Sequence, residues 1–194
     1  IRYSGEKMDI FSSVATDNLF VTSLQQQSQL EALSNSALSS GIDKYLRKEY
    51  EAAAKDFEKS ISLHPTSSFG ADTTKYLAQT YLRLDNTEKA IETYKRGIEL
   101  NRDRDDLRAA LGNLYYAENR FQEAVNEYQE AVRINSSSSS NHYSLGQGYL
   151  KTGKYSQAEQ EFRTVLRLEP DSPYGNYGLG LTYSKREAYE RAIE

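Results

Sequence analysis

The chain has 194 residues, of which 38% are hydrophobic and 27% are charged. Its 24 lysines and arginines stand against 28 aspartates and glutamates, a formal net charge of −4, so it lacks the basic excess with which proteins bind a nucleic-acid backbone. The absence of cysteine excludes disulfides, thiolate metal sites and a cysteine nucleophile, and no stretch approaches the roughly 18 apolar residues of a membrane span.

Residues 1–33 are predicted to form an N-terminal segment that lies outside the repeats described below. We expect a helix through residues 19–33, with Asp17 and Asn18 as capping residues. Because its apolar run is interrupted and no basic stretch precedes it, the segment is not a signal peptide, and we expect a cytoplasmic protein. Three interpretations are open: a helix that caps the first repeat, an arm that fills a groove of its own chain or of a neighbour, or disorder.

Residues 34–194 repeat themselves, with a first step of 37 residues and later steps of 34. One alanine recurs at the same place in each repeat: Ala53, Ala90, Ala124, Ala158 and Ala192. A small residue recurs ahead of it: Gly41, Ala78, Gly112, Gly146 and Gly180. The repeats are predicted at about 34–67, 71–104, 105–138 and 139–172, with a partial repeat at 173–194.

Each repeat is predicted to contain two amphipathic helices joined by a tight turn. The apolar residues from Phe121 to Val132 follow the i, i+3, i+4, i+7 spacing of a one-sided helix. Asn119 precedes this helix, and Gly153 stands at the equivalent place in the next repeat. Both residue types tolerate the left-handed conformation that ends a helix. The small residues of the first helices allow the two helices of a repeat to approach closely.

Fifteen of the 16 tyrosines divide into two groups by their position in the repeat. Nine occupy recurring positions and are predicted to be core: Tyr50, Tyr81, Tyr94, Tyr115, Tyr128, Tyr149, Tyr155, Tyr183 and Tyr189. Six others do not, and most of these are predicted to project from the first helices: Tyr45, Tyr76, Tyr116, Tyr143, Tyr174 and Tyr177.

The pattern Leu-Gly-x-x-Tyr stands at residues 111–115, 145–149 and 179–183. With the 34-residue period, it makes residues 34–194 resemble the tetratricopeptide repeat. The sequence departs from that family at its tryptophan position, which is filled by Arg108, His142 and Asn176. The resemblance implies an all-α, right-handed superhelical solenoid of helix-turn-helix repeats.

The resemblance also implies that the first helices line a concave groove that holds an extended peptide or a helix of a partner protein. Carried over position by position, the candidate peptide-binding residues are Lys75, Tyr76, Gln79, Arg83, Asn113, Tyr116, Tyr143, Gln147, Lys151 and Tyr177. Gln79, Asn113 and Gln147 form a ladder of amides, which suits an extended backbone because each amide both donates and accepts. The cations favour an acidic or carboxylate-bearing partner. The alternative is an unused polar face.

One subclass of the resembled family binds the C-terminal carboxylates of heat-shock chaperones through a clamp of lysine, asparagine and arginine. This chain departs from the clamp, since Ala110, Ser140 and Ser144 stand at clamp positions and only Lys75 partly conforms. We therefore do not expect the chaperone clamp here.

The groove positions of the first repeat, in contrast, are nearly all apolar: Leu38, Ile42, Tyr45 and Leu46. An apolar patch of this kind is normally covered. We expect the helix of residues 19–33 to dock there, either within the chain or by exchange between two copies in a homo-oligomer. Glu194 falls inside the expected second helix of a fifth repeat, so we also expect the natural chain to continue.

No arrangement of residues predicts catalysis, a metal or a cofactor. His64 and His142 lie in different repeats without a suitably spaced ligand, and the acidic residues 103–106 lack the remainder of a calcium loop. They are interpreted as favouring the N-terminus of the helix that follows. The predicted function is a non-catalytic scaffold or adaptor that binds a peptide or helix of a partner protein. The alternatives are a platform for homo-oligomeric assembly and an accessory repeat domain of a larger enzyme that continues after Glu194.

Overall fold

The computed structural model describes residues 6–65 and 68–193, and the side chains of residues 23–65 and 70–187. Within these ranges the chain forms nine helices and no strand, which confirms the all-α prediction of a solenoid of helical repeats. The chain divides into two compact units, Ile1–Leu84 and Asp85–Glu194. Each unit is described by itself, and the predicted superhelical hand stays a prediction.

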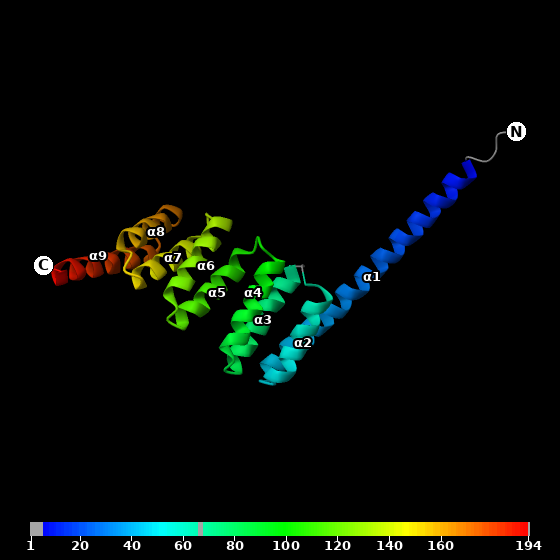
Figure 1. The fold of residues 1–194 in the computed structure, drawn as a ribbon, viewed down its shortest axis with the longest axis horizontal. Helices are drawn as coiled ribbons and strands as arrows, with labels where there is room; N and C mark the ends of the chain where they lie inside the picture. Colours follow the sequence, from blue (N-terminus) through cyan, green and yellow to red (C-terminus); the bar gives the residue numbers. More distant parts are fainter. Residues whose placement is uncertain (1–5, 66–67, 194) are drawn as a thin grey trace. The chain divides into compact units, whose positions relative to one another are not determined.

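The first unit contains α1 (Glu6–Leu46), α2 (Tyr50–Leu63) and α3 (Ser68–Arg83), which Figure 1 shows from blue to green. The helix α2 packs against both α1 and α3. Its Phe57 is fully buried, and a Cβ atom at Gly41 of α1 would lie 2.6 Å from the Phe57 ring. The predicted close approach of the two helices of a repeat therefore occurs in this unit.

The N-terminal segment differs from the prediction, because α1 is one uninterrupted helix into which Asp17 and Asn18 are incorporated. It has no glycine or proline between residues 6 and 40 to end a helix. Every side chain from Ser23 to Leu33 is exposed, and contact with α2 begins at Ser34, whose hydroxyl lies 3.0 Å from Ser60 Oγ. A continuous helix cannot fold back onto itself, so docking of this segment within the chain is wrong.

The second unit contains the other six helices, which pack in chain order, each against the next. They are α4 (Thr87–Leu100), α5 (Asp105–Ala117), α6 (Phe121–Ile134), α7 (Ser139–Lys151), α8 (Tyr155–Leu168) and α9 (Pro173–Ile193). The helices α5, α7 and α9 are also neighbours of one another in that order. They are the first helices of the predicted repeats three, four and five.

The turns between paired helices contain a residue with positive φ at the predicted place. Asn119 has φ 58° and Gly153 has φ 73°, as expected, and Lys48 and Asp85 adopt the same conformation at φ 65° and 53°. Beyond Asn119, the backbone N–H of Arg120 donates to the carbonyl of Tyr115 over 2.9 Å. This bond satisfies a carbonyl that the helix end would otherwise leave unpaired.

The fifth repeat also differs from the prediction. The expected turn and second helix are absent, because α9 continues from Pro173 to Ile193. The position equivalent to Gly153 is Glu187. Glutamate favours helix and disfavours positive φ, so the sequence provides no residue that would end α9 there. Accordingly, no described atom outside the backbone of α9 lies within 4 Å of an added Cβ at Gly180, unlike at its counterparts Gly112 and Gly146.

The core of the second unit is organised around aromatic rings that face glycines. An added Cβ at Gly146 of α7 would lie 2.8 Å from the Phe162 ring, and one at Gly178 of α9 would overlap the same ring. A Cβ at Gly112 would lie 2.6 Å from the ring of Tyr128. Phe162 is fully buried, so one ring fills the space that two first helices leave by lacking side chains.

Polar contacts with a glutamate replace the tryptophan that the resembled family has at the start of its first helices. Arg108 Nη1 lies 2.9 Å from Glu127 Oε2. One repeat later, His142 Nδ1 lies 2.6 Å from Glu161 Oε2, and its Nε2 lies 3.1 Å from the carbonyl oxygen of Ser136. Each pair joins the first helix of a repeat to the second. His142 is therefore a buried residue that packs between the two helices of its repeat.

Among the described residues, no helix is both long and apolar enough to cross a membrane.

Candidate functional site

The predicted peptide-binding residues are distributed over both units. Lys75, Tyr76, Gln79 and Arg83 lie on α3 of the first unit. The other six lie on the neighbouring helices of the second unit: Asn113 and Tyr116 on α5, Tyr143, Gln147 and Lys151 on α7, and Tyr177 on α9.

In the first unit, α3 presents a partly exposed ring beside a polar row. Tyr76 stacks on Phe57 of the core with ring centroids 5.7 Å apart, and 37% of its surface stays exposed. One turn further along α3, Gln79 is exposed. Arg83 Nε lies 3.3 Å from the hydroxyl oxygen of Tyr45, which joins α3 to α1.

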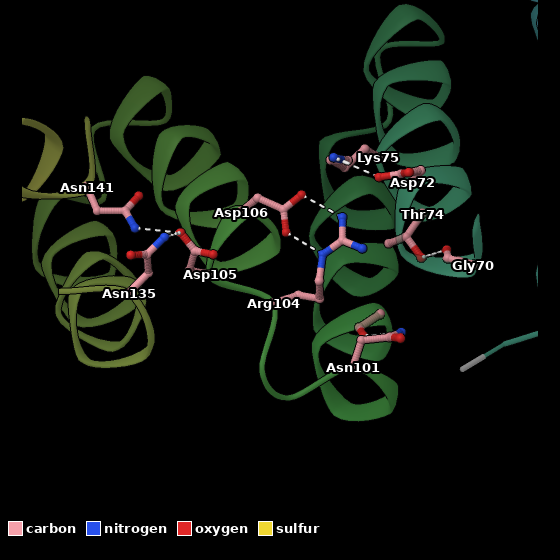
Figure 2. A network of polar contacts seen from close by, with 11 residues as sticks. Gly70, Asp72, Thr74, Lys75, Asn101, Arg104, Asp105, Asp106, Asn135 and Asn141 are labelled. Atoms are coloured by element: carbon pink, nitrogen blue, oxygen red, sulfur yellow. Dashed lines mark hydrogen bonds and ion pairs between the residues drawn. The ribbon is translucent and has the colours of Figure 1, made fainter. Parts of the chain in front are cut away.

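The other predicted site residues of this unit are Lys75 and the apolar residues of the first repeat. Lys75 Nζ lies 3.0 Å from Asp72 Oδ1 on its own helix, so its charge is engaged (Figure 2). Of the apolar residues predicted to be covered, Leu38 and Ile42 are half-buried, whereas 72% of Leu46 is exposed.

The second unit brings tyrosines of three consecutive first helices into one row. The ring of Tyr143 on α7 lies 5.4 Å from that of Tyr174 on α9, centroid to centroid, and 5.8 Å from that of buried Phe162. Tyr143 is half-buried, while 62% of Tyr174 and 64% of Tyr177 are exposed. We use the name tyrosine–amide face for the following residues of this unit: Asn113, Tyr116, Tyr143, Gln147, Lys151, Tyr174 and Tyr177.

The two amides of the tyrosine–amide face are each fixed by a tyrosine hydroxyl. Asn113 Oδ1 accepts a hydrogen bond from the hydroxyl of buried Tyr128 over 2.7 Å. Gln147 Nε2 donates to the hydroxyl oxygen of Tyr143 over 2.8 Å. Asn113 therefore still has two N–H donors to offer, and Gln147 has its carbonyl oxygen and one N–H.

Burial raises the pKa of three phenols at or beneath this face. It raises the pKa of Tyr143, with a smaller contribution from the nearby Tyr177 and Tyr174, and it also raises the pKa of Tyr116. The pKa of Tyr128 is raised strongly for the same reason. At neutral pH these hydroxyls are therefore neutral groups that both donate and accept hydrogen bonds.

Lys151, at the end of α7, lies beside two rings. Its Nζ atom is 5.9 Å from the ring centroid of Tyr116 and 5.5 Å from that of Phe121. The two rings contact each other edge to face, with centroids 5.2 Å apart. This arrangement allows a cation–π attraction that holds the ammonium group close to the tyrosine–amide face.

A polar network at the helix ends fixes α5 and α7, which carry most of this face. Figure 2 shows Asp105, in the first turn of α5, between two amides. Its Oδ2 accepts from Asn141 Nδ2 of α7 over 2.8 Å and from Asn135 Nδ2, at the end of α6, over 3.2 Å. Arg104 and Asp106 form a two-pronged ion pair of 2.8 Å at the same helix start. The acidic residues here are predicted to favour the N-terminus of α5. Asp105 in addition accepts a hydrogen bond from Asn141 of the next repeat.

The structure adds two aromatic residues that the predicted set does not contain. Phe121 lies beneath Lys151, although it starts a second helix, and Tyr174 contacts Tyr143. Tyr174 has a sequence signal, because it is one of the tyrosines outside the recurring core positions. Phe121 has none, since its spacing is that of an ordinary core residue.

The buried tyrosines follow the prediction with one exception among those whose side chains are described. Tyr81, Tyr94, Tyr115, Tyr128 and Tyr149 are buried, and Tyr50 and Tyr155 are half-buried. Tyr183 is 39% exposed, so its assignment to the core is wrong. The reason is that α9 has no following helix to cover it within the described residues. Tyr189 lies outside the residues whose side chains are described.

Family models match three parts of the chain. A model described as "TPR repeat" matches residues 112–153, and two described as "Tetratricopeptide repeat" match residues 143–194 and 77–104. A search of curated proteins found no match.

Solved structures similar to this chain include MamA, with 20% sequence identity and a TM-score of 0.67 over 83% of this chain and 86% of MamA. A tetratricopeptide repeat protein from Parabacteroides merdae has 16% identity and a TM-score of 0.72, covering 82% of this chain and 62% of that one. The second such domain of human RPAP3, solved with an HSP70 peptide, has 27% identity and a TM-score of 0.54 over 58% of this chain and 94% of its own.

The repeat period, the paired helices with their left-handed turns, the glycine–aromatic contacts and the three family models all agree. This chain belongs to the tetratricopeptide repeat family.

Proposed function

We propose that this protein is a non-catalytic scaffold or adaptor, and that its tyrosine–amide face binds an extended peptide or a helix of a partner protein. The observation that carries the proposal is the combination of exposed aromatic surface with fixed, half-satisfied amides. Tyr174 and Tyr177 leave more than half of their surface to solvent. Tyrosine is enriched among the residues that dominate binding energy at protein interfaces.

The amides supply the polar part of such a site. Asn113 and Gln147 are each held by one tyrosine hydroxyl, so binding a peptide would cost little side-chain entropy. Asn113 N–H groups would donate to a carbonyl of the peptide, and Gln147 Oε1 would accept from a peptide N–H. This pairing is what an extended backbone requires.

The similarity to the human RPAP3 domain supports a peptide as the ligand, since that domain was solved with an HSP70 peptide. We do not propose the same partner. Ala110, Ser140 and Ser144 replace the residues of the chaperone clamp in this chain.

The first unit would contribute a smaller binding surface. Tyr76 and Gln79 are exposed on α3, and Arg83 is held by the hydroxyl of Tyr45. We propose that these residues bind a separate part of the partner. Replacing Tyr76 with alanine would then weaken binding without removing it.

The test is a selection of peptides from a displayed random library on the full 194-residue chain, followed by affinity measurements on variants. The double variant Asn113→Ala with Gln147→Ala is expected to weaken the selected peptides at least tenfold, since two hydrogen bonds of about 1 kcal/mol each are lost. The matched control is Asn126→Ala with Gln157→Ala, which removes two exposed amides from α6 and α8.

A further variant separates the loss of an amide from the loss of the hydrogen bond that holds it. Tyr128→Phe deletes the bond to Asn113 while leaving both amides in place. Helicity measured by circular dichroism is expected to be the same in all variants. Unaltered affinity in the Asn113/Gln147 double variant would show that the amides do not bind the peptide.

A second candidate function is homo-oligomeric assembly through α1. The observation that favours it is the exposure of Leu24, Leu30 and Leu33 on the part of α1 that precedes its packing against α2. We propose that two copies pair through these leucines, with the exposed Leu46 as part of the surface. Light scattering is expected to give a multiple of the monomer mass for the full chain and the monomer mass after removal of residues 1–33. The same oligomeric state for the full chain and for the chain without residues 1–33 would exclude this function.

A further inference from the structure

The charge of Lys151 is the feature of the tyrosine–amide face to which the proposed function gives no role. It is the only lysine, arginine, aspartate or glutamate in α7. In the part of the chain that the structure describes, no carboxylate lies within ion-pair distance of its Nζ atom, and its contacts are with the rings of Tyr116 and Phe121. The side chain is exposed.

The neighbouring helix α5 does not provide the missing carboxylate. Its Asp105 is bound by two amides, and its Asp106 is paired with Arg104. Its one cation, Arg108, is paired with Glu127. Lys151 is thus the one lysine or arginine of α5 and α7 whose charge the described residues leave uncompensated.

The two rings also direct the ammonium group. A cation held against aromatic faces keeps its remaining N–H groups for other acceptors. Gln147 lies one helical turn before Lys151 on the same helix, so both side chains emerge from the same side of α7. A peptide backbone bound by Gln147 would therefore bring its own side chains within reach of Lys151.

We propose that the partner is an extended segment that carries an aspartate or glutamate, and that this carboxylate binds Lys151 while the segment's backbone binds Asn113 and Gln147. This inference rests on the proposed function and adds the chemistry of the ligand to it. Charge complementarity carries it, because a carboxylate on the partner compensates a cation that has no counter-ion on its own face.

The experiment uses the peptides selected on the full chain. A selection on the wild-type chain is expected to enrich one acidic position, and a parallel selection on Lys151→Gln is expected to lose that enrichment. For a selected peptide, Lys151→Gln is expected to weaken binding about threefold to tenfold, the range for an ion pair on a partly exposed surface. Arg167→Gln, which removes one exposed positive charge from α8, is expected to change affinity by less than about twofold.

A double-mutant cycle ties the effect to one carboxylate. Changing the enriched acid of the peptide to its amide is expected to weaken binding as much as Lys151→Gln does, and the two changes together are expected to add no further loss. Peptides that bind without an acidic position, or fully additive losses, would overturn the inference and leave the proposed function intact. If the chain selects no peptide at all, the proposed function itself fails, and this inference with it.

Discussion

Replacing Gly178 of α9 with alanine is expected to destabilise the second unit, whereas replacing Gly180 with alanine is expected to stabilise it. Gly178 and Gly180 lie two residues apart on the same helix, and alanine is favoured over glycine in a helix by about 1 kcal/mol at both. They differ in what a methyl group would meet. At Gly178 it would overlap the ring of Phe162, whereas at Gly180 no described atom outside the backbone of α9 lies within 4 Å.

The size of the effect follows from the position of that ring. Phe162 has little room to move, because it is fully buried and a Cβ at Gly146 would also lie 2.8 Å from its ring. Adding a methyl group to such a core costs about 1–3 kcal/mol, toward the upper end when the neighbour is fixed. After the gain in helix propensity, Gly178→Ala is expected to destabilise the second unit by about 1–2 kcal/mol. Gly180→Ala is expected to stabilise it by up to about 1 kcal/mol.

Urea unfolding followed by circular dichroism measures the two variants against the wild type. Hydrogen exchange of the amides in α8 and α9 locates the change, since a repeat contacts only its neighbours. Gly178→Ala with a midpoint equal to or above that of Gly180→Ala would refute the reasoning that Phe162 has little room to move.

Three further predictions concern ion pairs and turns. Arg108→Met leaves the half-buried Glu127 without its cation and is expected to destabilise the second unit by about 1–2 kcal/mol in urea, with part of the loss recovered by adding Glu127→Gln. The control Arg133→Met, which breaks the exposed pair with Glu130, is expected to cost less than about 0.5 kcal/mol. Lys48→Gly is expected to stabilise the first unit by up to about 1 kcal/mol, because Lys48 has φ 65° and glycine adopts this conformation without steric cost; a lower thermal midpoint would contradict it. Acid is expected to weaken the first unit through Asp56, whose pKa lies below its ordinary value of 3.8 mainly because Lys44 Nζ, at 2.6 Å, and Ser40 Oγ, at 2.5 Å, donate to its carboxylate. The fold favours the ionised form, so this contribution is present above pH 3.8 and is lost as pH falls through the lower folded value. Asp56→Asn is expected to remove that part of the pH dependence of urea unfolding.

The repeat itself could be read from the sequence because its determinants are local. The 34-residue spacing of glycines and aromatics predicts paired helices, and Asn119 and Gly153 predict the turns. Lys48 shows the limit of this reasoning. Its side chain gives no sign of a left-handed turn, and the packing of α1 against α2 imposes it.

Both ends of the array were predicted less well, for a common reason. The expected helix break before residue 34 and the expected turn near Glu187 were inferred from the repeat register, while the local sequence favours continued helix at both places. In the interior of the second unit, the first helix of a repeat packs against the second helix that follows its turn. Where that neighbour is missing from the described residues, local propensity decides.

The candidate site was predictable as a set of positions on first helices, but its chemistry was not. The spacing of Asn113 and Gln147 says nothing of which amide atom is already bound. That depends on the hydroxyls of Tyr128 and Tyr143, which come from another helix and from one turn away. The contact of Lys151 with the ring of Phe121 likewise joins two different repeats.

The buried rings of Tyr128 and Phe162 have a consequence for the proposed ligand binding, although neither ring belongs to the tyrosine–amide face. Added Cβ atoms at Gly146 and at Gly178 would both come too close to Phe162, and one at Gly112 would come too close to Tyr128, so these rings set how closely α7 and α9 approach α8 and how closely α5 approaches α6. The helices α5, α7 and α9 bear the proposed peptide-binding residues of this unit. In the proposed binding mode the core would therefore act as a spacer that determines the register in which successive residues of a bound chain are read, and a wider ring such as tryptophan at position 162 would shift that register without altering any residue on the surface.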